Sequence, residues 1–147
     1  MPLETGTAMP SLAGATEWLN ATGASAEAGA RGRATLVHFW SANCGDCREG
    51  LPRVAELRER HPGLHVVAVH TPHDEDEADA ESVRDAVAQC NLSEPCAVDN
   101  GHQLRDTFGL ASGDVPAYFL FDAEGKLLKS ATGASGLETI AAELGGL

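Results

Sequence analysis

Two nearly continuous apolar runs dominate the hydrophobic pattern of this chain, at residues 34–41 and 64–70. The first is rich in β-branched and aromatic residues, and the second is typical of a strand in a sheet that is covered on both faces. Between them, apolar residues recur every three to four positions from residue 44 to about residue 60, which predicts a helix. A strand, a helix and a strand of these lengths form a crossover unit, so we expect the two strands to be parallel.

The rest of the pattern predicts shorter elements on either side of this unit. Residues 1–9 are interpreted as a flexible lead-in, and residues 20–33, rich in Gly, Ala and Ser, as a loop that includes one helical turn. The acidic stretch from Asp74 to Asp85 is interpreted as a solvated loop and the first turn of a helix. Helices are expected at 10–21, 82–91, 101–108 and 137–144, and strands at 96–99, 117–122 and 127–131, the last two joined antiparallel by the turn at 123–125.

Length and charge narrow the class of protein. The 147 residues predict a single domain over 1–147 with a real core. The formal charge of −12 disfavours nucleic acid and anionic membranes as partners, and no apolar run approaches the roughly 18–20 residues that span a bilayer. The N-terminal residues lack the basic and apolar segments of a signal peptide, so a cytoplasmic location is expected, with an oxidising compartment left open. We also expect a monomer.

Cys44 and Cys47 lie where the first strand passes into the helix. The unpaired N–H groups and the dipole of a helix N-terminus stabilise a thiolate, so Cys44 is expected to be the nucleophile. Cys47, three residues on, faces it across one turn and can close a small disulfide ring. Two thiols so placed suit thiol–disulfide exchange, in which one attacks a target disulfide and the other resolves the mixed disulfide.

The same spacing also occurs in zinc sites, so a second hypothesis is a non-catalytic binding module. Four thiolates, from Cys44, Cys47, Cys90 and Cys96, would suffice for zinc, but the last two are separated by five residues and do not form the usual short knuckle. Iron–sulfur binding would need a similar convergence. We therefore predict no metal and no bound organic cofactor, and zinc content would separate the two hypotheses.

The chain resembles the thioredoxin superfamily, in which the C-x-x-C motif follows a strand that ends as Phe39-Trp40 does here. Pro52 matches the proline that kinks the active-site helix of that family, and Val115-Pro116 matches its cis-proline loop. The order of elements is similar to the TlpA/ResA-like branch, and in particular to thioredoxin-like domains joined to NHL repeats, although no repeats are present. The resemblance implies an α/β three-layer thioredoxin-like fold, with a central mixed sheet and helices on both faces.

The resemblance also implies how a substrate would bind. Pro116 would be cis and would present the backbone of Val115 to an extended substrate chain, beside Trp40 and Asn43. Asn43 stands where thioredoxin has a bulky tryptophan, which leaves the substrate preference open. The partners implied are protein disulfides and an electron donor that the sequence does not identify; peroxide reduction is a third possibility that the superfamily offers.

His38 lies six residues before Cys44, where thioredoxins carry a buried aspartate that shuttles protons for the resolving cysteine. A neutral imidazole could accept the Cys47 proton, and a core histidine bonded to a carbonyl is an equal alternative. Glu49 could supply the acid that the TlpA/ResA-like branch places after its motif, but it comes one residue early, about 100° away around the helix.

Two charges act on the dithiol in opposite directions. Arg48 favours the thiolate, whereas Asp46, between the cysteines, repels it and should raise the thiol pKa. A less stabilised thiolate makes the reduced form less favourable, so we expect a reducing couple. Cys90 and Cys96 have three interpretations: two buried free thiols, a second disulfide, or a redox pair that relays electrons to Cys44 and Cys47.

Overall fold

The computed structural model describes residues 3–42, 44–72, 80–111 and 114–146. A six-stranded mixed sheet forms its centre, in the order β1-β4-β3-β2-β5-β6. The strands run Glu17–Leu19 (β1), Thr35–Trp40 (β2), His65–His70 (β3), Cys96–Val98 (β4), Ala117–Phe121 (β5) and Leu127–Thr132 (β6). The helices run Gly23–Gly29 (α1), Gly45–Arg60 (α2), Ala80–Gln89 (α3), Gln103–Thr107 (α4) and Gly136–Gly145 (α5).

The strands predicted from the two long apolar runs are confirmed as the middle of the sheet. β2 and β3 pair in parallel, with His38 opposite Ala68, and every residue of β2 is buried. β2 also pairs antiparallel with β5, which places His38 beside Tyr118. Because side chains alternate along a strand, His38 faces the same side of the sheet as Leu36 and Trp40.

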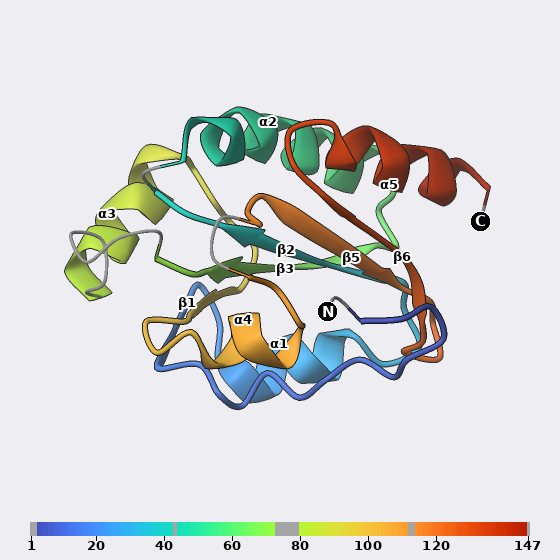
Figure 1. Cartoon of the computed structure of the whole chain (residues 1–147), viewed down its shortest axis with the longest axis horizontal. Helices are drawn as coiled ribbons and strands as arrows, with labels where there is room; N and C mark the ends of the chain where they lie inside the picture. The colour runs from blue at the N-terminus through green and yellow to red at the C-terminus, as the bar shows by residue number, and fades with distance from the viewer. Residues whose placement is uncertain (1–2, 43, 73–79, 112–113, 147) are drawn as a thin grey trace.

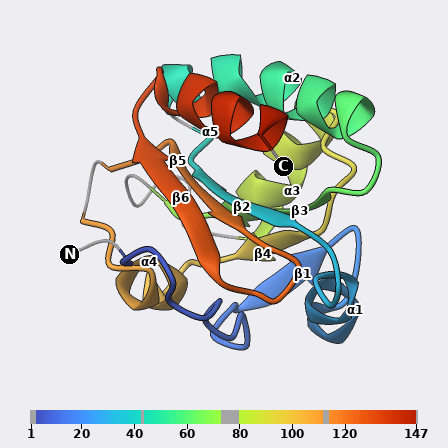
Figure 2. The ribbon, with the colours of Figure 1, turned by 90° about the vertical axis from the view of Figure 1, so that its right-hand side faces the viewer.

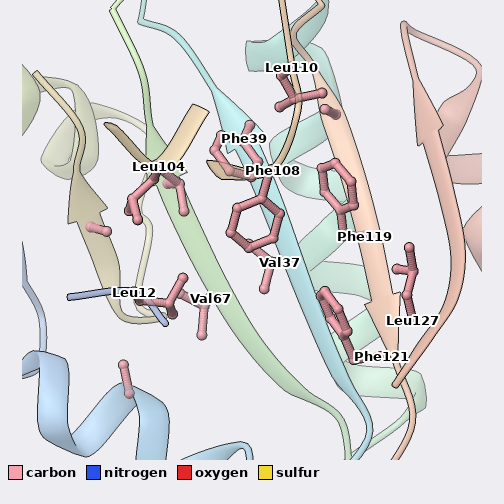
Figure 3. Close-up of a cluster of buried hydrophobic side chains, with 14 residues drawn as sticks. Leu12, Val37, Phe39, Val67, Leu104, Phe108, Leu110, Phe119, Phe121 and Leu127 are labelled. Carbon is pink, nitrogen blue, oxygen red and sulfur yellow. The ribbon is translucent and has the colours of Figure 1, made fainter. Parts of the chain in front are cut away.

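Helices cover both faces of the sheet, as the three-layer fold requires (Figures 1 and 2). α2 and α5 lie on one face, and α3 packs on the same side, where its apolar residues join the cluster around Trp40 and Cys47. α1 and α4 lie on the opposite face. There Phe39, Phe108 and Phe119 stack edge to face, with ring centroids 5.0 to 5.8 Å apart (Figure 3).

The helix predicted at 10–21 is wrong. Residues 17–19 form β1, which pairs antiparallel with β4, with Trp18 opposite Ala97. A three-residue strand has no periodicity to read. The edge of β4 offers unpaired N–H and C=O groups that must be satisfied, and this tertiary pairing outweighs a weak local helix preference.

The N-terminal third holds two further differences. The single turn expected within residues 20–33 is the seven-residue helix α1, which Thr22 caps by accepting a hydrogen bond from the Ser25 N–H. In the lead-in, Gly6 and Met9 donate backbone hydrogen bonds to the β5–β6 turn, and Ala8 bridges to Lys126. The expected acidic loop at residues 74–79 lies outside the described residues.

Candidate active site

Cys44 is the N-cap residue of α2 and is half-buried. Its Sγ accepts a hydrogen bond from the Cys47 N–H at 3.2 Å, so the thiol satisfies one of the donors that a helix N-terminus leaves unpaired. The Cys44 Sγ therefore stands at the positive end of the helix dipole, where negative charge on sulfur is favoured. Pro52 lies inside the same helix.

Cys47 lies deeper, on the face of α2 that packs against Trp40 and Leu51, and is 1% exposed. Burial is the main reason that the pKa of the Cys47 thiol is raised well above its usual value; the hydrogen bond to Cys44 and the charges of Cys44 and Asp46 raise it further. The expected effect of Asp46 is therefore present but small. The two thiols differ in access, and only Cys44 is open to a large substrate.

Arg48 was expected to favour the thiolate, but its guanidinium has other partners. Its Nε donates to the carbonyl oxygen of Ala42 at 2.5 Å, and NH1 lies 3.8 Å from the Cys90 Sγ. The side chain thus ties the segment before the motif to the end of α3.

The peptide bond between Val115 and Pro116 is cis. The Val115 carbonyl oxygen lies 4.0 Å from the Cys44 Sγ, so the loop before β5 stands beside the half-buried thiol. Val115 is half-buried and Pro116 is buried. The structure brings this pair to the dithiol, where an extended chain could lie against the Val115 backbone.

Of the other two expected substrate-binding residues, Trp40 is not at that surface. Trp40 is 1% exposed and packs edge to face with His70, with ring centroids 4.8 Å apart. The Trp40 side chain packs in the buried cluster that includes Cys47, so it cannot contact a substrate in this arrangement. Asn43 lies outside the described residues.

His38 forms a buried pair with Glu94, a residue that the sequence analysis did not single out. The His38 Nε2 lies 2.8 Å from the Glu94 Oε2, and the other carboxylate oxygen lies 3.4 Å from NH1 of Arg58. Among the described residues, His38 bonds neither cysteine, and its partner is a carboxylate rather than the carbonyl of the alternative interpretation. Glu49 is exposed, so the buried acid near the motif is Glu94, and Glu49 is not a candidate.

The positions of His38 and Glu94 relative to the sheet explain how this buried pair forms. Glu94 precedes β4, which is two strands away from β2, and Ala68 on the strand between them is small enough for the imidazole to reach across. Burial raises the pKa of Glu94, but the hydrogen bond and charge of His38, together with the charge of Arg58, outweigh it and hold that pKa below the usual value. The only sequence signal was an acid directly before Pro95 and a buried strand.

A cavity of about 260 Å³ opens between α2 and the segment that follows α3. Leu51 and Arg58 line it from α2, and Cys90 and Glu94 line it from the other side. Glu94 therefore borders both the buried imidazole and a space that is partly open to solvent.

The four thiols do not gather at one point. All four cysteines are free in this structure, and Cys96 is fully buried with its Sγ 3.7 Å from the Ala97 carbonyl oxygen. Within the described ranges, no group of three or more His, Cys, Asp or Glu side chains is placed to hold a metal ion. The zinc hypothesis thus has no site in that part of the chain.

Comparisons with known proteins agree with this geometry. The sequence family described as Redoxin matches residues 4–144. The chain is 38% identical over 133 residues to the thiol-disulfide oxidoreductase YkuV of Bacillus subtilis (strain 168), covering 90% of this chain and 88% of that one. It is 30% identical to the thiol-disulfide oxidoreductase ResA of Bacillus thuringiensis (strain Al Hakam), over 70% of this chain and 57% of that one.

Among solved structures, a thioredoxin-like protein in its oxidised form, determined in solution, superimposes with a TM-score of 0.85 at 35% identity. That match covers 97% of this chain and 95% of the other. No helix in the described ranges is long and apolar enough to cross a membrane.

Proposed function

Because this chain belongs to the redoxin family and is a thiol–disulfide oxidoreductase of the TlpA/ResA-like thioredoxin branch, we propose that Cys44 and Cys47 reduce disulfides in protein substrates. The single observation that carries this assignment is the asymmetry of the two thiols. Cys44 stands half-buried at the helix N-terminus, and Cys47 is buried one turn away with its N–H on the Cys44 sulfur.

In the first step the Cys44 thiolate attacks one sulfur of a substrate disulfide. A bond forms between Cys44 and that sulfur, the substrate S–S bond breaks, and the second substrate sulfur leaves as a thiolate that takes up a proton. The extended substrate pairs with the backbone of Val115, which lies beside the Cys44 Sγ.

In the second step Cys47 loses its proton and attacks the Cys44 sulfur of the mixed disulfide. The Cys44–Cys47 disulfide forms and the substrate leaves as its second thiol, so two electrons have passed from the protein to the substrate. A separate dithiol donor must then reduce the new disulfide. Because burial disfavours the Cys47 thiolate, the reduced form is less stable and the couple is reducing.

His38 accepts the Cys47 proton in this scheme. Its Nε2 lies 2.8 Å from the Glu94 Oε2, so the carboxylate fixes the orientation of the imidazole ring. Among the described residues His38 hydrogen-bonds neither cysteine, so the transfer does not follow a direct hydrogen bond of this structure.

Substrate trapping tests the proposal. Cys47→Ser should leave Cys44 covalently joined to its substrates in cells, and Cys44→Ser is the matched control that should trap none. Equal capture by both variants would contradict the proposed roles. The proteins captured would also decide the cellular compartment, which stays a prediction, as does the monomeric state.

A further inference from the structure

Tyr118 is the only tyrosine of the chain, and it lies on β5 directly beside His38. Its residue is 2% exposed, and its side chain packs on the face of the sheet that α2 and α5 cover. The proposed dithiol mechanism uses none of its atoms. A buried phenol beneath the active-site helix therefore needs an account.

Two glycines make room for this ring. A Cβ on Gly50 of α2 would lie 2.7 Å from the Tyr118 hydroxyl oxygen, and a Cβ on Gly136 of α5 would lie 3.1 Å from its Cδ2. Glycine within a helix is unfavourable compared with alanine, so its presence at Gly50 has a structural reason, which is the close approach of the hydroxyl to the helix. The sequence thus builds a slot that aims the phenol at α2.

The hydroxyl reaches α2 on the side that carries the resolving thiol. Gly50 follows Cys47 by three residues, and residues at that spacing share one helix face with Cβ atoms about 5–6 Å apart. Burial, followed by the negative charge of Cys47, raises the pKa of Tyr118 to about 12. The phenol is therefore protonated under ordinary conditions, and its O–H is available as a donor at Gly50, one turn along α2 from Cys47.

We propose that the Tyr118 hydroxyl stabilises the Cys47 thiolate during resolution by directing its O–H dipole at that sulfur. This rests on the proposed function, in which Cys47 is the second attacking thiolate. Tyr118 gives up no proton and forms no bond to substrate, so it is a positioning residue. Its effect opposes the burial of Cys47 and lets a deeply placed thiol ionise when the mixed disulfide forms.

The first test measures Cys47 directly. In a Cys44→Ser background, Tyr118→Phe keeps the ring between the two glycines and removes only the hydroxyl. Alkylation of Cys47 at fixed pH, followed by peptide mass spectrometry, should become about tenfold slower, equivalent to a rise of about one unit in its pKa. Gly50→Ala, which displaces the hydroxyl, should slow it similarly, whereas Gly136→Ala, whose Cβ would meet the ring edge and Ala131 but not the hydroxyl, should slow it less.

Unchanged Cys47 alkylation in Tyr118→Phe overturns the proposal, even if both alanine variants slow the reaction equally.

A second measurement needs no variant. Tyrosinate absorbance of this single tyrosine should rise at lower pH in the oxidised protein than in the reduced one, because the disulfide removes the thiolate charges. Identical titrations in the two states would also overturn it. Failure of the proposed function would appear separately, as disulfide reduction that survives Cys44→Ser.

Discussion

The His38 imidazole and the Glu94 carboxylate form a buried pair 2.8 Å apart, although 56 residues separate them in the chain. The pair occupies the level of the sheet at which thioredoxins place a single buried aspartate. Here a histidine stands at that position, and a carboxylate from the loop before β4 approaches it. The pair lies next to the cavity beside α2, because Glu94 also lines that cavity.

Loss of the Glu94 charge should destabilise the protein in a pH-dependent way. Its pKa is lower in the folded state than the usual 4.5, so its contribution is fully present above that value and is lost as the pH falls through the folded value. Glu94→Gln should lower the free energy of unfolding at neutral pH by about 1–3 kcal/mol, with the difference from the wild type shrinking in acid. Denaturant unfolding across a pH series measures it.

Glu49→Gln is the matched control, because it removes the same charge from an exposed position of α2. Surface substitutions of this kind usually change stability by less than about 0.5 kcal/mol. A constant difference between wild type and Glu94→Gln at every pH would mean that the carboxylate charge contributes nothing.

His38→Ala should slow the resolution of a mixed disulfide far more than its formation. The first step uses the Cys44 thiolate at the helix N-terminus, whereas the second requires removal of a proton from Cys47, whose pKa is strongly raised by burial. Single-turnover kinetics with a chromogenic disulfide separate the two steps. Equal slowing of both steps, or a change in stability alone, would assign His38 to core packing.

The long periodic elements could be predicted from the sequence, and the short or mutually dependent features could not. β2, α2 and β3 each repeat their pattern over at least six residues, so their type and parallel pairing follow from local reasoning. β1 has three residues and exists because β4 offers it an edge, which no local pattern reveals. The N-cap position of Cys44 was predictable because it needs only the strand–helix boundary.

The missed part of the site depends on contacts between distant elements. Glu94 gains its importance from His38 across Ala68, and Tyr118 gains its position from Gly50 and Gly136 on two different helices. Trp40 was placed at the surface by resemblance, but the packing of α2 and α3 buries it. Such relationships depend on tertiary packing, because the sequence alone does not show which distant residues lie close together in the fold.

Cys44→Ser should abolish the reduction of insulin by dithiothreitol, because Cys44 is the accessible thiol at the helix N-terminus. Alkylation of the reduced protein at neutral pH should label Cys44 before Cys47, which is 1% exposed. Cys90→Ser is the control that should retain activity, since it removes a half-buried thiol outside the motif. Preferential labelling of Cys47 would reverse the assigned roles.

Cys90 and Cys96 should behave as two separate free thiols. The Cys90 sulfur faces the Arg48 guanidinium at 3.8 Å, whereas the Cys96 sulfur points to the Ala97 carbonyl and is fully buried. Burial raises the pKa of Cys96 to about 12, so native alkylation should label Cys90 first and leave Cys96 almost untouched. Air-oxidised protein unfolded in denaturant should then show two free thiols, with the other two cysteines joined as the Cys44–Cys47 disulfide.

Thiol counting distinguishes this expectation from the alternatives. An oxidised sample with no free thiols would show that Cys90 and Cys96 form a second bridge, and would contradict the expectation of two separate thiols. The double variant Cys90→Ser, Cys96→Ser tests the relay directly. Full insulin reduction by that variant would mean that electrons reach Cys44 and Cys47 without the second pair, because a relay that has lost both its thiols can carry none.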